Sequence, residues 1–168
     1  MKRLVFISGF LVVLAFVFAA GKKPLQSPEL KWYTSLDEAH QLSQKNNKPI
    51  FAFFTGSDWC GWCMKLQRDV FAKEAFKKWA NEHVILLELD YPKKKKLPDN
   101  LRIQNQNLAK AFNIQGYPKV WLFRTEKDSA KNNLNINAYG SLGYPVGAEA
   151  GKEEVSFLNT ANAILGIK

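Results

Sequence analysis

The sequence predicts an α/β fold with a central mixed β-sheet flanked by helices on both faces. Two short, mainly apolar runs, IFAFF at 50–54 and VILLELD at 84–90, are typical of strands buried on both faces. Helical patterns separate the strand-like segments as far as residue 123. The last two β patterns, at 116–123 and 134–141, follow one another without a helix between them, so the predicted sheet is mixed rather than wholly parallel.

The first half of the predicted domain starts with a short edge strand at 30–33. Ser35 then begins a helix that should end near Asn46, because the stretch S-L-D-E places Glu38 at the third position of a capping box. Its buried face is expected to contain Leu36, Ala39, Leu42 and Ser43.

Beyond the strand at 50–54, residues 64–83 are expected to form one or two helices. Their apolar faces are supplied by Leu66, Val70, Phe71, Phe76 and Trp79. Trp79 and Trp121 are assigned to the core.

The second half of the domain is expected to contribute one more helix, two more strands and a closing helix. In chain order these are a helix at 105–113, strands at 116–123 and 134–141, and an amphipathic helix at 152–165. They are connected by a proline- and lysine-rich segment at 91–104, a loop at 125–133 and turns at 145–151. The inner face of the last helix is expected to contain Val155, Leu158, Ala161 and Leu165.

The N-terminus has the layout of a secretory signal peptide. Lys2 and Arg3 form a positive region, an apolar run at 4–18 follows, and small residues surround the expected cleavage after Ala19. The alternative is an uncleaved anchor, because the apolar run lies at the short limit of what spans a bilayer. We expect contact with a membrane only in that second case.

The chain is therefore divided into a signal peptide at 1–19, a flexible leader at 20–29 and a domain at 30–168. Cleavage leaves 149 of the 168 residues, which is enough for one domain with its own hydrophobic core. The expected location is a bacterial periplasm or the cell exterior, so the protein would be periplasmic or secreted.

The chain is basic, with a formal net charge of +9 that falls to +7 when Lys2 and Arg3 are removed. Only the four lysines at 93–96 form a cluster, and no interleaved aromatic residues indicate a nucleic-acid-binding face. We interpret 93–96 as a solvated loop. The alternative is a weak attraction for acidic partners or a membrane surface.

The chemistry of the chain is concentrated in TGSDWCGWCMKL at 55–66, which holds both cysteines, Cys60 and Cys63. A structural disulfide is a poor explanation, because a bridge across three residues closes almost no loop. Haem attachment requires a histidine where Met64 stands. Structural zinc needs four ligands, and the chain offers only His40 and His83 besides the cysteines.

Two interpretations of the pair stay open from the residues alone. Copper(I) accepts thiolate and thioether ligands, so Cys60, Cys63 and Met64 could bind it. Redox exchange needs an accessible, stabilised thiolate and a second thiol that resolves the mixed disulfide. A helix that starts near Cys60 favours the thiolate there and places Cys63 one turn further in, less exposed. Lys65 could add positive potential, although a solvated helix position is the ordinary role for a lysine. The redox interpretation needs no metal and no organic cofactor.

The chain resembles the thioredoxin superfamily, and in particular its exported bacterial thioredoxin-like proteins. The resemblance lies in the strand IFAFF, the motif D-W-C-G-W-C at 58–63, the strand VILLELD, and F-x-x-x-G-Y-P-K-V-W-L-F from Phe112. It covers roughly residues 30–166 and implies a thioredoxin fold.

The resemblance also implies roles for individual residues. Cys60 would be the nucleophile and Cys63 the resolving thiol. Pro118 would follow a cis peptide bond and pack beside the disulfide, with the backbone of Tyr117 available to a substrate strand. The flanking residues of the motif would act on the disulfide itself: Trp59 would shield it, and Gly61 and Trp62 would tune its potential.

One feature of the family is missing. Thioredoxins usually carry a buried aspartate six residues before the first cysteine, where this chain has Phe54, and Phe53 beside it is no substitute. The lysine that often accompanies that aspartate would fall near Leu86. An apolar floor raises the pKa of a thiol by desolvation, so Cys63 would need another proton acceptor. Glu88 or a water molecule could supply it.

The sequence thus predicts a protein-disulfide oxidoreductase that exchanges disulfides with exported proteins and with a redox partner. The motif is compatible with reduction, oxidation and isomerisation. Two rival functions are kept: a non-enzymatic thioredoxin-fold module that binds a partner at Tyr117 and Pro118, and a Cu(I) carrier.

Overall fold

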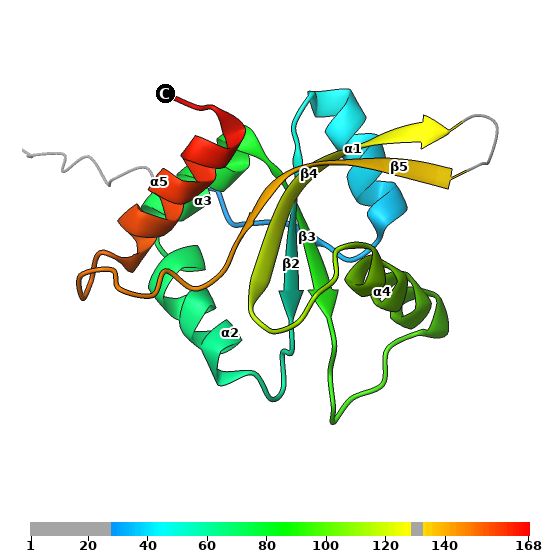
Figure 1. Ribbon diagram of the computed structural model, residues 1–168, viewed down its shortest axis with the longest axis horizontal. Coiled ribbons are helices and arrows are strands. Elements are labelled where there is room, and N and C mark those ends of the chain that lie inside the picture. Colours follow the sequence, from blue (N-terminus) through cyan, green and yellow to red (C-terminus); the bar gives the residue numbers. More distant parts are fainter. Residues whose placement is uncertain (1–27, 129–132) are drawn as a thin grey trace, which may run out of the picture.

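A computed structural model of the protein describes residues 28–128 and 133–168. The proposed signal peptide and all but two residues of the proposed leader lie outside these ranges. The described chain contains one five-stranded sheet in the order β1-β3-β2-β4-β5. Helices cover both of its faces, as the sequence predicts (Figure 1). No helix within the described ranges is long and apolar enough to cross a membrane.

The sheet is mixed. Its strands are β1 (Trp32–Tyr33), β2 (Ile50–Thr55), β3 (Ile85–Asp90), β4 (Lys119–Asp128) and β5 (Asn133–Leu142). The strands β1 and β2 both pair with β3 in parallel, whereas β4 pairs antiparallel with β2 and with β5. The predicted edge strand and the two buried central strands are therefore confirmed.

The helices alternate with the strands up to β4, and one more closes the chain. They are α1 (Leu36–Asn46), α2 (Gly61–Leu66), the π-helix η1 (Gln67–Phe71), α3 (Glu74–His83), α4 (Asp99–Ala111) and α5 (Glu153–Leu165). The first of them begins as predicted, with the Ser35 hydroxyl accepting a hydrogen bond from the Glu38 amide.

Alternate residues of β2 point to opposite faces of the sheet and divide the core into two clusters. Phe51 and Phe53 pack with α2, η1, α3 and α5, in the cluster that also contains both cysteines. Phe54 packs with α1 and α4 in the second cluster. Trp79 is buried in the first cluster, whereas Trp121 is only partly buried, against the second.

Three expectations about the second half are wrong in detail. The helix α4 begins at Asp99 rather than at 105, because Pro98 and Asp99 form a first turn that Arg102 ties down by an ion pair. The first four residues of the expected loop at 125–133 belong to β4, which continues through Asp128 because it pairs with β5, and Asn133 begins β5. Val155 is exposed, since the buried face of α5 is centred on Phe157 and Ala161.

Candidate active site

The cysteine motif lies at the end of the sheet where β2 and β3 finish and α2 begins (Figure 1). Cys60 is the N-cap of α2, and the backbone N–H of Cys63 donates a hydrogen bond to the Sγ of Cys60 at 3.1 Å. Gly56 makes this turn possible, because a Cβ at that position would overlap the indole of Trp59. The predicted helix start at Cys60 is confirmed.

The two cysteines are joined in a disulfide with a Cα–Cα distance of 5.2 Å. Cys60 is 5% exposed and Cys63 is fully buried, so the outer and inner positions are those that the sequence predicts. The bridge is part of the hydrophobic core on one side and reaches the protein surface on the other only at Cys60.

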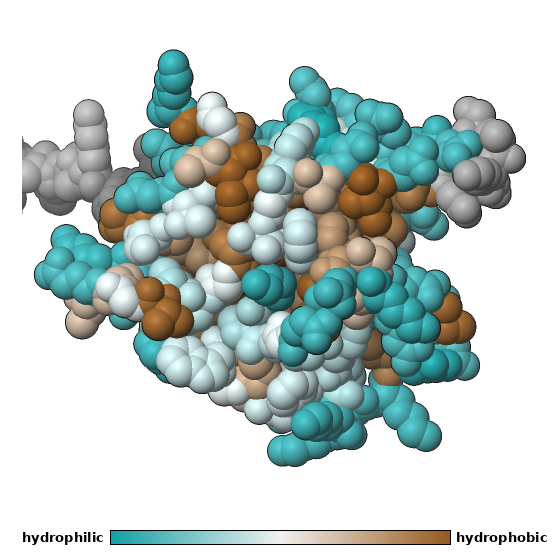
Figure 2. Space-filling view, viewed as in Figure 1, coloured by the Kyte–Doolittle hydropathy of each residue, from teal (hydrophilic) through white to brown (hydrophobic). Residues whose placement is uncertain are grey.

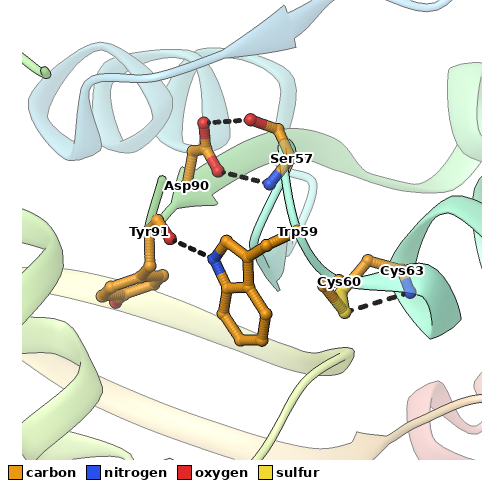
Figure 3. Close-up of a disulfide and its surroundings, with 6 residues drawn as sticks. All are labelled: Ser57, Trp59, Cys60, Cys63, Asp90 and Tyr91. Atoms are coloured by element: carbon orange, nitrogen blue, oxygen red, sulfur yellow. Dashed lines mark hydrogen bonds between the residues drawn. A yellow bond between two sulfur atoms is a disulfide. The ribbon is translucent and has the colours of Figure 1, made fainter. Parts of the chain in front are cut away.

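An aromatic wall stands on one side of the disulfide. The Trp59 indole points toward Tyr91, whose carbonyl oxygen accepts a hydrogen bond from Nε1 at 2.8 Å (Figure 3). The ring of Tyr117 packs edge-on against Trp59 and also contacts Tyr91. Burial raises the pKa of both tyrosines above the ordinary value. The peptide bond between Tyr117 and Pro118 is cis, as predicted.

A second set of contacts fixes the outer side of α2. Trp62 is 55% exposed and packs edge-on against Tyr144. Lys65 donates hydrogen bonds to Asp69 and to the Tyr144 hydroxyl, so it is neither free nor merely solvated. The Lys65 ammonium lowers the pKa of Asp69 to about 2. A Cβ added at Gly61 would meet no atom within 4 Å beyond its chain neighbours and the backbone of its own helix, so this side of the motif is open.

Two carboxylates position the turn that precedes Cys60. Asp90 accepts hydrogen bonds from the amide and the hydroxyl of Ser57, at 2.8 and 2.7 Å (Figure 3). Asp58 accepts hydrogen bonds from the backbone N–H groups of the loop that follows β3, the nearest from Lys93 at 2.9 Å. These contacts join the motif to the end of β3.

The strand β2 contributes no acidic side chain to the buried side of the disulfide. The prediction that Phe54 occupies the position of the missing aspartate is wrong, because Phe54 faces α1 and α4 and Phe53 is on the cysteine side. Since both residues are phenylalanine, the conclusion that β2 contributes no carboxylate here is unchanged. A hydroxyl does end the strand: Thr55 Oγ1 is buried and has no hydrogen-bond partner among the described residues.

Glu88 is the carboxylate nearest in register, since β3 places it opposite Phe53. It lines a pocket of about 690 Å³ together with Phe53, Ser57 and Met64, the residue after Cys63. No other described residue forms a hydrogen bond or salt bridge with the Glu88 side chain. Burial raises the pKa of Glu88 above its ordinary value; Asp90 raises it further and Lys95 acts in the opposite direction.

The two histidines lie away from the cysteines. His40 is on α1, on the opposite face of the sheet, where its Nδ1 is 2.8 Å from the Thr125 hydroxyl. His83 ends α3 and packs against Trp79. In the described part of the chain, no three His, Cys, Asp or Glu side chains are grouped closely enough to hold one metal ion.

Sequence reasoning missed several residues that shape this site. Ser57, Asp58 and Asp90 act through contacts between segments more than 30 residues apart, which no local pattern encodes. Tyr144 lies in a stretch without regular structure and was not singled out. The one available indication was the position of Asp58 directly inside the motif.

The comparisons with known proteins agree with this geometry. The model of the thioredoxin-like family matches residues 31–125. Disulfide bond reductase DsbH of Chlamydia pneumoniae is 38% identical over 98 residues, which cover 58% of each chain. Thioredoxin-related protein DsbJ of the same organism is 28% identical over 151 residues, which cover 90% of this chain and 42% of DsbJ. A solved structure of a DsbH oxidoreductase matches with a TM-score of 0.70 at 27% identity, over 96% of both chains.

The chain belongs to the thioredoxin-like family. The fold predicted from the sequence is thereby confirmed as a thioredoxin fold. The chain spans little more than half of DsbH and less than half of DsbJ in these alignments.

Proposed function

We propose that the protein is a thiol–disulfide oxidoreductase that acts on protein substrates. The observation that carries the proposal is the cysteine pair at the start of α2, in which only Cys60 has any exposed surface and the amide of Cys63 donates a hydrogen bond to its sulfur. A donor aimed at the sulfur stabilises the thiolate more than the thiol, which lowers the pKa of a cysteine and activates it. The names of the DsbH and DsbJ relatives support the same chemistry.

The reaction proceeds in two exchanges. The Cys60 thiolate attacks one sulfur of a substrate disulfide, which forms a mixed disulfide and releases the other substrate sulfur as a thiolate. The Cys63 thiolate then attacks Cys60, forms the internal disulfide and releases the substrate as a dithiol. Two electrons and two protons pass from the protein to the substrate, and a dithiol redox partner restores the reduced pair. The reverse sequence oxidises a substrate.

The residues around the pair have supporting roles in this proposal. Trp59 covers one approach to the disulfide, and the backbone of Tyr117 beside Pro118 pairs with the substrate chain. Gly61 and Trp62 tune the potential. Their positions on two sides of the motif support these roles, since Trp59 contacts Tyr117 and Trp62 contacts Tyr144.

Glu88 takes the proton of Cys63 in this scheme. The buried Cys63 thiol must lose its proton before it can attack, and the strand β2 offers only Phe53 on that side. Glu88 and Met64, the residue after Cys63, line a pocket large enough to hold water, and in this proposal a water molecule relays the proton from the thiol to the carboxylate.

The proposal includes export. Residues 1–19 would be removed as a signal peptide, residues 20–29 would form a leader, and residues 30–168 would act as one domain in the periplasm or outside the cell. An oxidising compartment gives a disulfide oxidoreductase its substrates.

Reduction of insulin by dithiothreitol tests the activity. The wild-type protein is expected to precipitate the insulin chains well above the uncatalysed rate, because Cys60 offers a stabilised thiolate. The control is a Cys60→Ser, Cys63→Ser double variant, which should give the uncatalysed rate. A wild-type protein no faster than this control would contradict the proposal and favour a non-enzymatic binding module.

A further inference from the structure

Four lysines stand beside the disulfide, in the loop that follows β3. We call residues 93–96 the lysine loop; all four side chains are exposed. The loop lies at the same end of the sheet as the cysteine motif (Figure 1). Hydrophilic side chains project from this end of the molecule in Figure 2. The sequence predicts a solvated loop, and its exposure is confirmed.

The cysteine motif itself holds the lysine loop in place. The two carboxylate oxygens of Asp58 accept hydrogen bonds from the backbone N–H groups of Lys93, Lys94 and Lys95, at 2.9, 2.8 and 3.3 Å. The bond from Lys93 is the largest of the effects that lower the pKa of Asp58. A loop whose backbone is bound in this way stays close to Cys60, which is two residues after Asp58.

Two of the four lysines are engaged with the site. The Lys93 ammonium lies over the ring of Trp59, 4.1 Å from its centroid, and so is next to the residue that precedes Cys60. The Lys95 ammonium is 3.0 Å from a carboxylate oxygen of Asp90. The remaining two, Lys94 and Lys96, form no salt bridge with any described residue.

The acidic groups that face the loop do not cancel its charge. Asp58, Asp90 and Glu88 contribute at most three negative charges against four positive ones, and the two aspartates are already occupied by Ser57, the loop amides and Lys95. Asp99, which lines a pocket with Lys95 and Lys96, is paired with Arg102. The lysine loop therefore carries uncompensated positive charge. A substrate chain that approaches Cys60 from this side would pass the loop.

We propose that the lysine loop is an electrostatic docking surface that selects protein substrates whose cysteines lie among acidic residues. This inference rests on the proposed function. Complementary charge raises the rate at which a partner reaches a site by about 10- to 1,000-fold, and salt reduces the effect. A protein substrate fits better than a membrane because the loop is bound to the cysteine motif and one of its lysines covers Trp59.

The test measures how fast the reduced protein is oxidised by disulfide peptides that differ only in their flanking residues. Glutamate, serine and lysine versions are compared, with tryptophan fluorescence as the readout. At low salt the glutamate peptide is expected to react about 10-fold faster than the serine peptide, and the lysine peptide more slowly than either. In about 1 M salt, where the screening length is about 3 Å, the three rates should converge.

Two charge-reversal variants separate the loop from the overall charge. K94E/K96E should lose the preference for the glutamate peptide and keep the rate with the serine peptide. K45E/K127E changes the net charge equally, at exposed positions on α1 and β4, and should retain the preference.

Equal rates with all three peptides at low salt would overturn the inference, as would an equal loss in both variants. Equal rates combined with loop-dependent binding to vesicles of anionic lipid would assign the loop to a membrane surface instead. Failure with every peptide, including serine, would contradict the proposed function itself.

Discussion

A Cys63→Ser variant is expected to accumulate covalent mixed disulfides with protein substrates through Cys60. Without Cys63 no thiolate can attack the Cys60 sulfur, so the first exchange occurs and the second does not. The measurement is acid quenching, alkylation and non-reducing electrophoresis, in which the trapped species should disappear on addition of dithiothreitol. The hydroxyl of serine is similar in size to the thiol, so the buried position is disturbed little.

The matched control is Cys60→Ser, which leaves only the buried cysteine. Cys63 is fully enclosed, so this variant should trap no substrate and should lose all turnover in the insulin assay. Mixed disulfides in Cys60→Ser, or equal amounts in both variants, would show that the roles of the two cysteines are assigned the wrong way round or that the pair is passive.

A Glu88→Gln variant is expected to resolve its mixed disulfide about 100-fold more slowly near neutral pH. General acid–base groups typically contribute 10²- to 10⁴-fold, and a water molecule can partly replace the lost carboxylate, so the lower limit applies. The measurement is the decay of a preformed mixed disulfide at Cys60 as a function of pH. The wild-type rate should follow the ionisation of a carboxylate with a raised pKa, and that inflection should be absent from the variant.

The Glu88→Gln substitution, which is expected to slow resolution of the mixed disulfide, should at the same time increase the stability of the folded protein as pH rises. Because folding raises the pKa of Glu88 above 4.5, the carboxyl contributes stability that is fully present below that value and is lost as pH rises through the folded pKa. Glutamine does not ionise, so the variant should gain stability relative to the wild type with increasing pH. Glu126→Gln makes the same change at an exposed position and should alter neither property. A Glu88→Gln protein with the wild-type decay rate at every pH would leave Glu88 without a role in proton transfer.

The central strands and the site of the cysteine pair could be predicted because their causes are local. A strand buried on both faces must be apolar throughout, and β2 shows this directly in its sequence. The capping box of α1 needs only Ser35 and Glu38, three residues apart. The N-cap position of Cys60 follows from a strand, a short turn and a helix in succession.

The errors come from elements whose causes are not local. The first two turns of α4 are mostly polar, and of their two large apolar residues Ile103 is half exposed and Leu101 is only partly buried, so the sequence shows no continuous apolar face there. The end of β4 is a strand because β5 pairs with it, not because of its own pattern. Which residue of β2 faces Cys63 depends on the conformation of the turn after Thr55. A count of six residues back from Cys60 predicts Phe54, whereas Phe53 faces the cysteines.

The lysine loop is the clearest case of a feature whose sequence pattern has an ordinary explanation. Four consecutive lysines are usually solvated, and nothing near them in the sequence indicates a partner. Only the folded chain brings them to Asp58, 35 residues earlier. The charge was visible in the sequence, whereas its position beside Cys60 was not.

The reduction potential of the Cys60–Cys63 couple tests most directly whether this pair is redox-active. It is measured by equilibrating the protein with dithiothreitol or glutathione buffers of known potential and quantifying the free thiols. We expect a reversible two-electron transition between about −270 and −120 mV, the range of dedicated disulfide oxidoreductases. A potential below about −300 mV, typical of structural disulfides, would contradict the proposed function.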